Sequence, residues 1–355
     1  MTKRARVLIA SATCLVALLA VALLLPVPFV KMAPGPTYNV IGEVGGVPVI
    51  DIEGTEVYST TGAMDMTTVM ESGGPRGGLT FVEAIGSWFN AADAVLPREL
   101  LYPDDVSGED VKVRQAALFS TAESNSVAAA LNFLDEPVRT ELVVTAVYEG
   151  TPAAGKLEPR DRILNVNGEA VAEPAQVGEA VRSQPIGTTF AFTVQRLVDG
   201  ELKELVVEVA SQDNPDEPGT PQVGIGVGLN YAADFDITFT LKDIGGPSAG
   251  MMFALGLVDK LTPADLARGR HIAGTGTITP EGEVGTIGGI RQKLAGARAA
   301  GAELFLMPAA HCTEAADHVP DGLTVVPIKT LADAVGAVEA WNDGGKGLAA
   351  CPGEA

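Results

Sequence analysis

The sequence has few cysteines, few histidines and few aromatic residues. Its 355 residues include three cysteines, three histidines and 5% aromatic side chains. No C-x-x-C pair is present, which argues against a structural zinc site. A Ser–His–Asp triad would need one of the three histidines, which we interpret as surface or packing residues: His271, His311 and His318. We therefore expect no metal ion and no cofactor.

Basic residues are also scarce. Lys and Arg number 24 against 45 Asp and Glu, which gives a formal net charge of −21. Phosphate binding needs clustered Lys and Arg, so this surface repels nucleic acid, and its charge favours solubility instead. The hydrophobic fraction of 46% allows a sizeable core and argues against wholesale disorder. The length of 355 residues suits two or three domains.

Only one apolar run is long enough to cross a bilayer. Residues 7–30 carry no charge, and Val7 to Leu25 alone would form a helix about 28 Å long, close to the ~30 Å of a bilayer core. Three basic residues precede the run within residues 1–6, so the positive-inside rule places that tip in the cytoplasm. We predict a transmembrane helix over 7–29, in a single-pass protein of the cell membrane whose bulk is extracytoplasmic.

A cleaved signal peptide is the alternative interpretation of this run. Such peptides have an apolar region of ~7–15 residues that ends in an A-x-A-like site. This run is longer and ends in Pro26-Val27-Pro28-Phe29, which favours an uncleaved anchor. If the body is exported, two cysteines can form a disulfide that ties down the C-terminal tail at 343–355, or they remain unpaired thiols: Cys312 and Cys351.

Residues 30–133 contain no recognisable chemistry. Short β-rich pieces with Gly and Pro occupy 36–72, and Ala- and Leu-rich stretches with helical spacing follow at 79–92 and about 107–133. We interpret this strand-plus-helix region as a packing or spacer subdomain.

Residues 134–211 predict a strand–turn–strand–helix–hairpin unit. Asn167-Gly168 and Asp199-Gly200 are its expected turns, and residues 174–183 form its short helix. This order of elements resembles the PDZ family in its bacterial permuted form, as do Thr151-Pro152-Ala153, Leu157-x-x-Arg160-Asp161-x-Ile163 and Val166-Asn167-Gly168. Where Arg160 stands, that family usually has Gly. The resemblance implies a peptide-binding groove between a strand and the short helix, but it does not locate the carboxylate-binding loop.

The rest of the chain reads as a linker, a last domain and a tail. The polar segment 212–222 holds three prolines, which is typical of a linker. Strands alternate with helical stretches from 223 to 342, which indicates an α/β or α+β domain before the tail at 343–355. The expected fold class is therefore α+β and multidomain, with one transmembrane helix, a β-rich domain and an α/β domain.

The sharpest local motif is Gly245-Gly246-Pro247-Ser248-Ala249-Gly250. It follows a predicted strand, and its glycines permit a tight turn before an apolar helix. Ser248 then lies near a helix N-terminus, where free backbone N–H groups can stabilise an oxyanion, and the surrounding turn is formed by Gly246, Pro247 and Ala249. An ordinary Ser N-cap in a Gly-rich turn is the alternative.

The second motif is a helix that begins near Gly289. Lys293 shares an apolar stripe at i, i+3, i+4 and i+7 with Ile290, Leu294 and Ala297. Desolvation would lower the pKa of its amine from ~10.4, and a neutral amine can accept the proton of a serine hydroxyl. The alternative is a lysine that snorkels from the edge of the stripe.

Both motifs belong to a segment that resembles the proteolytic domain of the Lon peptidase family. The segment reads GGPSAGMMFALGLVD, GTGTI, GEV and IGGIRQK in that order and continues to LTVVPIKTLADAV. The resemblance implies that Ser248 is the nucleophile, that Lys293 is its general base and that Thr275 orients the lysine. Many members carry an acidic residue three positions before the serine, where this chain has Gly245.

The sequence contains no G-x-x-x-x-G-K-[ST] motif for ATP. The combination resembles the membrane-bound, PDZ-containing Lon-like peptidases of bacteria. It implies an ATP-independent serine endopeptidase whose polypeptide substrates are unfolded or exposed extracytoplasmic and membrane proteins, captured or gated by the PDZ domain. It also implies a homo-oligomer, commonly a ring of six. The alternative is a membrane-tethered PDZ adaptor with an inactive Lon-like domain, and the lysine on an apolar stripe argues against it.

Overall fold

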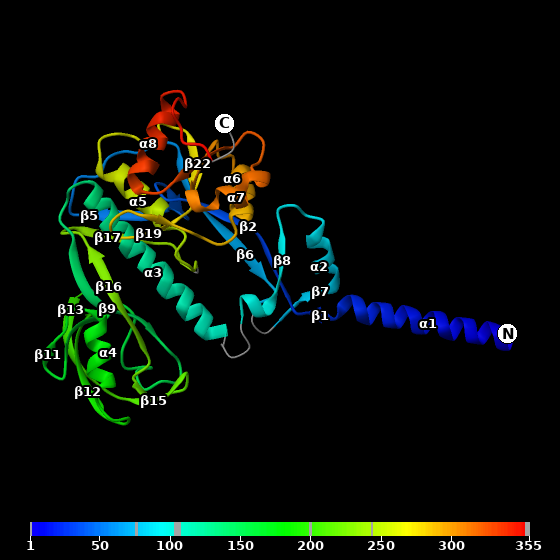
Figure 1. The fold of residues 1–355 in the computed structure, drawn as a ribbon, viewed down its shortest axis with the longest axis horizontal. Helices are drawn as coiled ribbons and strands as arrows, with labels where there is room; N and C mark the ends of the chain where they lie inside the picture. Colours follow the sequence, from blue (N-terminus) through cyan, green and yellow to red (C-terminus); the bar gives the residue numbers. More distant parts are fainter. Residues whose placement is uncertain (1, 75–76, 103–107, 199–200, 243, 352–355) are drawn as a thin grey trace.

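The computed structural model describes residues 2–74, 77–102, 108–198, 201–242 and 244–351 (Figure 1). A long N-terminal helix, α1 (Lys3–Leu24), extends away from a body that has two parts. One part is built on a mixed sheet with helices on both faces, and the other is a β-rich unit with one helix. The predicted α+β, multidomain fold class is confirmed.

Helix α1 begins and ends earlier in the chain than the predicted span of 7–29. Leu25 has extended backbone angles (φ −63°, ψ 131°), because the residue before a proline is disfavoured in the α-helical region. Pro26–Val27 then form strand β1, which pairs with β7 (Leu79–Thr80). In the described part of the chain, only α1 has the length and apolar composition to span a membrane, and these properties also fit a signal sequence.

The main sheet has six strands in the order β22-β21-β18-β6-β2-β8. Strands β6, β18, β21 and β22 run parallel, whereas β2 and β8 are antiparallel to their neighbours. The strand bounds are β2 Phe29–Asn39, β6 Ala63–Ser72, β8 Ala94–Pro97, β18 His271–Gly274, β21 Leu304–Pro308 and β22 Thr324–Ile328.

This sheet corrects the prediction that residues 30–133 form a packing or spacer subdomain of their own. Strands β2, β6 and β8 come from that region, and β6 lies in the middle of the sheet. Met64 and Met66 of β6 are buried in the same core as α5. Burial of these apolar side chains against distant segments of the chain drives the pairing.

Helices cover both faces of the main sheet. Successive residues of β21 point to opposite faces: Leu304 and Leu306 belong to the core under α3, α5 and α8, whereas Phe305 and Met307 face α6. The helix bounds are α3 Gly108–Phe133, α5 Gly250–Leu261, α6 Ile290–Ala300, α7 Cys312–Ala315 and α8 Leu331–Asn342.

The β-rich unit has its own sheet and core. Its five main strands follow the order β13-β12-β10-β9-β16, with β11 beside β10. The elements are β9 Arg139–Val147, β10 Arg162–Val166, β11 Glu169–Ala170, α4 Pro174–Arg182, β12 Thr189–Val198, β13 Glu201–Ala210 and β16 Ile225–Ala232.

The two predicted turns of this unit have different outcomes. Asn167 and Gly168 both have positive φ (53° and 82°), as a two-residue hairpin turn requires. Strands β12 and β13 pair up to Val198 and Glu201, and the predicted Asp199-Gly200 turn lies outside the described residues.

Two predicted boundaries differ from the observed strand pairing. Strand β16 pairs along its length with β9, so residues 225–232 belong to the β-rich sheet and not to the last domain. The predicted linker at 212–222 is a small hairpin of β14 (Gln212–Asn214) and β15 (Glu217–Gln222). Prolines at the edge of a two-stranded ribbon leave its pairing possible, because the missing N–H groups can face solvent.

Shorter elements complete the described chain. Helix α2 (Phe81–Trp88) follows β7, and β17 (Asp236–Phe239) pairs with β5 (Ile50–Glu53). The remaining elements are β3 Glu43–Val44, β4 Val47–Pro48, β19 Thr277–Ile278, β20 Val284–Gly285 and the 3-10 turns η1 Arg98–Leu100, η2 Ala309–His311 and η3 Ala316–His318.

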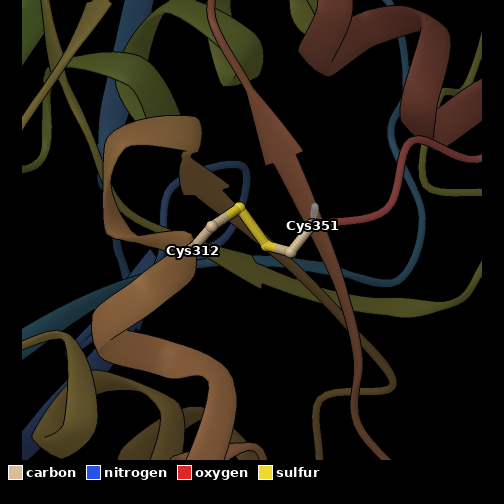
Figure 2. Close-up of a disulfide and its surroundings, with 2 residues drawn as sticks. All are labelled: Cys312 and Cys351. Carbon is tan, nitrogen blue, oxygen red and sulfur yellow. A yellow bond between two sulfur atoms is a disulfide. The ribbon is translucent and has the colours of Figure 1, made fainter. Parts of the chain in front are cut away.

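Cys312 and Cys351 form a disulfide (Figure 2). The sequence allows either this disulfide or two free thiols. The structure has the disulfide, with the two Cα atoms 5.4 Å apart. Cys351 is buried in the small core beneath α6, whereas Cys14 on α1 is free and exposed. Disulfides persist in oxidising compartments and are rare in the cytosol.

Replacing both Cys312 and Cys351 by Ser should lower the free energy of unfolding by about 2–4 kcal/mol, because the bond closes a loop across a sequence separation of 39. The measurement is urea unfolding of the full chain in detergent. Cys14→Ser is the matched control and should leave the midpoint unchanged. Equal midpoints for the double variant and the wild type would contradict a stabilising bond.

Candidate functional site

The loop that carries Ser248 is held against helix α3. The N–H of Gly246 donates a hydrogen bond to the carbonyl oxygen of Gln115 (3.0 Å), and Gly246 has a φ of +86°. A Cβ atom on Gly245 would lie 2.8 Å from the Gln115 Cβ, so the loop approaches the helix too closely for a larger residue. Glycine is required for this left-handed turn and this contact.

Ser248 is not the N-cap of the following helix. Helix α5 begins at Gly250, its N-cap is Ala249, and no side chain caps it. The half-buried Ser248 hydroxyl instead accepts a hydrogen bond from Nζ of Lys293 at 2.7 Å. This contact joins two side chains that lie 45 residues apart in the sequence.

Lys293 lies on the buried stripe of α6, as its spacing predicts. Ile290, Leu294 and Ala297 are fully buried, and Lys293 is 2% exposed. The helix packs on β2 and β6, and a Cβ atom on its N-cap Gly289 would lie 2.8 Å from Cγ2 of Val69 on β6. Lys293 therefore does not snorkel to the surface.

Burial lowers the pKa of Lys293 from 10.5 to about 7. Desolvation is the cause, because a cationic amine loses its hydration inside the protein. Among the residues that the structure describes, no carboxylate forms an ion pair with Lys293 to oppose this effect. A substantial fraction of the amine is neutral near pH 7 and can accept a proton.

Thr275 links the serine loop to the lysine. It is completely buried and directly follows β18. Its Oγ1 accepts a hydrogen bond from Nζ of Lys293 (2.8 Å) and donates one to the carbonyl oxygen of Ser248 (3.1 Å). The N–H of Gly276 donates to the same carbonyl at 2.9 Å. These bonds fix the backbone of Ser248 and the end of the lysine side chain.

Backbone N–H groups beside the Ser248 hydroxyl are available to bind an oxyanion. Pro247 has no N–H, and the N–H of Gly246 already donates to Gln115, so these two residues shape the turn. Within the described ranges, the N–H groups of Ser248 and Ala249 have no hydrogen-bond acceptor. They lie just before a helix N-terminus, where unsatisfied donors favour negative charge.

The histidines take part in other contacts. Nε2 of His271 lies 2.9 Å from a carboxylate oxygen of Asp65, and Nε2 of His311 accepts a hydrogen bond from the N–H of Ile287 (3.0 Å). No group of three or more His, Cys, Asp or Glu side chains that could hold a metal ion occurs in the described chain.

A second candidate site lies on the β-rich unit. A groove of about 250 Å³ lies between α4 and the segment where β15 ends and β16 begins. Its lining includes Val177 and Val181 of α4, together with Val223 and Ile225. Strand β16 is at the end of its sheet, and Gly224 before it has a φ of +84°. Sequence reasoning missed this loop because it assigned residues from 223 onward to the last domain.

Two protein-family models match parts of this chain. Residues 240–338 match the Lon protease (S16) C-terminal proteolytic domain, and residues 143–196 match the PDZ domain. The first range contains Ser248, Thr275 and Lys293. The family match supports the assignment of the β-rich unit as a PDZ domain, which extends through the pairing of β16.

Individual relatives share only part of their length with this chain. The Lon protease of Buchnera aphidicola subsp. Schizaphis graminum is 37% identical over 95 residues, which is 26% of this chain and 12% of that protein. The Lon protease of Azorhizobium caulinodans is 29% identical over 185 residues, which is 50% of this chain and 21% of that protein. The solved PDZ domain of an SdrC-like protein from Listeria monocytogenes is 20% identical, with a TM-score of 0.21, and covers 24% of this chain and 86% of that one.

Lys293→Met should change how stability depends on pH. The wild-type amine has a pKa of about 7 in the fold and ~10.4 when unfolded, so between these values the unfolded chain binds more protons and the free energy of unfolding rises with pH. The variant lacks this rise. From pH 6 to pH 9 the wild type should gain about 2–3 kcal/mol relative to the variant, at ~1.4 kcal/mol per pKa unit.

Urea unfolding at several pH values measures this difference, and other titrating groups cancel because both proteins contain them. Arg291→Met, an exposed position on the same helix, is the control and should differ from the wild type by the same amount at every pH. Parallel pH curves for the wild type and Lys293→Met would show that the amine titrates normally.

Proposed function

We propose that this chain, which contains a Lon-type proteolytic domain and a PDZ domain, is a serine endopeptidase with a Ser248–Lys293 catalytic dyad. The supporting observation is the 2.7 Å contact between a serine hydroxyl and a buried amine. Burial lowers the pKa of this amine to about 7. A base of that pKa is well suited to accept a hydroxyl proton near neutral pH.

In the proposed reaction, Oγ of Ser248 attacks the carbonyl carbon of a peptide bond while Nζ of Lys293 takes the hydroxyl proton. The N–H groups of Ser248 and Ala249 stabilise the negative charge that develops on the carbonyl oxygen. Lys293 then gives the proton to the leaving amine, and an acyl-enzyme remains. A water molecule, deprotonated by the same lysine, hydrolyses this ester and restores Ser248.

Thr275 is the proposed positioning residue of the dyad. Its hydroxyl is bonded to both the lysine amine and the carbonyl of Ser248, so it fixes the distance between base and nucleophile. Many Lon relatives have an acidic residue three positions before the serine, and Gly245 stands there. In this proposal, desolvation lowers the pKa of Lys293, and Thr275 holds its amine in position.

The proposed enzyme works outside the cytoplasm without ATP. Helix α1 serves as its membrane anchor. The disulfide supports a location in an oxidising compartment. The sequence has no phosphate-binding loop of the G-x-x-x-x-G-K-[ST] type. Such an enzyme has no motor to unfold its substrates, so we propose that it cleaves unfolded or exposed segments of extracytoplasmic and membrane proteins.

The groove beside α4 is the proposed capture site for these segments. An extended peptide can add to the free edge of β16 and place its side chains against Val177 and Val181. The turn at Val223–Gly226, with the left-handed Gly224, is the proposed cradle for a terminal carboxylate. A Cβ atom on Gly224 would collide with the side chain of Thr151, so this turn requires glycine.

Ser248→Ala and Lys293→Met should each abolish cleavage of an unfolded protein such as casein, because nucleophile and base act as a unit. Thr275→Val should lower the rate by about 10–100-fold, since the contribution of a general base, ~10²–10⁴-fold, depends on its position. Gel or mass-spectrometric analysis of the products gives the rates.

Thr279→Ala, a change outside the Ser248–Lys293–Thr275 contacts, is the control and should retain activity. Equal circular dichroism spectra establish that the variants fold. If Ser248→Ala cleaves casein as fast as the wild type, the dyad is wrong. A purely adaptor protein would cleave nothing in any form.

Ile225→Lys should weaken binding of a hydrophobic peptide with a free C-terminus by at least about tenfold, equivalent to ~1.4 kcal/mol, because it places a charge beside the valines that line the groove. Fluorescence anisotropy of a labelled peptide measures the affinity. The matched control is Leu202→Lys on β13, at the opposite edge of the sheet, which should bind normally. An equal loss of affinity in both variants would contradict the groove as the peptide-binding site.

A further inference from the structure

Helix α2 exposes its apolar face and buries its small residues. At 100° per residue, its large apolar side chains fall within an arc of about 120°. Those large residues are Phe81, Val82, Ile85 and Trp88, with Phe89 immediately after the helix. Trp88 is 67% and Phe89 is 87% exposed, whereas the buried residues of the helix are Ala84 and Ser87. A surface helix of a soluble domain has the reverse arrangement.

Both ends of α2 are held next to the exit of α1. Strand β7, directly before α2, pairs with β1, so Thr80 lies opposite Pro26. Strand β8, a few residues after α2, pairs with the first residues of β2. Lys31 and Asp93 add an ion pair of 2.8 Å between the same two segments. Helix α2 also contacts α1 directly.

Helix α2 lies on the side of the body from which α1 leaves. In Figure 1, α2 lies between the body and α1, and it runs across the direction of α1. Ala84 and Ser87 are the buried residues of α2, and its aromatic residues Phe81, Trp88 and Phe89 are exposed. A helix in this orientation lies along the surface of a bilayer that α1 enters.

The chemistry of this face fits a lipid headgroup region. Trp and Phe are favoured where an apolar boundary meets water, and an amphipathic helix lies in that plane with its apolar face in the lipid. Helix α2 contains no Lys or Arg, so attraction to anionic lipid does not supply this contact. The face is apolar and does not depend on the charge of the lipid.

We propose that α2 is an interfacial membrane helix, whose Trp88, Phe89 and Phe81 insert into the headgroup region of the bilayer that α1 enters. The proposal rests on the proposed membrane location of α1. Two attachments fix the orientation of the body relative to the bilayer, whereas one helix followed by a single strand would leave it free to rotate.

Trp88 is a built-in probe, because the chain has only two tryptophans. In the full chain with Trp341→Phe, reconstituted in phosphatidylcholine vesicles, Trp88 is the sole tryptophan. Its emission should shift to shorter wavelength, and phosphatidylcholine with bromine on its acyl chains should quench most of it, in low and in high salt. The Trp88→Phe chain, which keeps Trp341, is the control and should not be quenched.

Two further variants test the proposed face in the Trp341→Phe background. Replacing Phe81 and Phe89 by Ser should reduce the quenching of Trp88. Ile186→Ser removes a comparably exposed apolar side chain from the PDZ domain and should leave the quenching unchanged.

A chain whose only tryptophan replaces Leu15 of α1 separates this proposal from the proposed anchor. Quenching at position 15 without quenching of Trp88 would overturn the interfacial helix and leave the anchor intact. A blue-shifted but unquenched Trp88 would mean that another protein surface covers α2, which also overturns the proposal. Absence of quenching at both positions would overturn anchor and interfacial helix together.

Discussion

The desolvated amine of Lys293 is the interaction on which the candidate site depends. An amine in water would be protonated at pH 7 and could not accept a proton from Ser248. Burial on the stripe of α6 lowers its pKa to about 7, and no carboxylate among the described residues counters this. Its hydrogen-bond partners, the hydroxyls of Ser248 and Thr275, are neutral groups that hold the amine in place.

The burial of that amine depends on segments that are far apart in the sequence. Helix α6 packs on β2 and β6, which come from the N-terminal third, and Gly289 allows its first turn to approach Val69 closely. The loop of Ser248 is held by Gln115 of α3, also from the N-terminal region. The region that looks like a spacer in the sequence thus forms part of the wall and the support of the site.

Local patterns in the sequence were sufficient for the helices, the stripe of Lys293 and the turn at Asn167, because each depends on neighbouring residues. Strand pairing depends on contacts between distant residues, and no local signal shows that β6 lies beside β18. The prolines of 212–222 resemble a linker, so the strand after them was placed in the wrong domain. The disulfide was undecidable for the same reason, since spacing alone cannot bring Cys312 and Cys351 together.

Helix α3 connects the two candidate sites physically. Near its middle, Ser124 accepts a hydrogen bond from the N–H of Tyr231 on β16 (2.6 Å), and Asn125 donates one to the carbonyl of Ile278 (2.9 Å). Toward its start, Gln115 holds the loop of Ser248. A peptide added to β16 therefore binds a strand whose other contacts lie on the helix that supports the nucleophile. Strand β16 thus lines the groove at its start and is hydrogen-bonded to α3 near its end. The groove proposed to capture unfolded chains and the loop of the proposed nucleophile are therefore both attached to one helix.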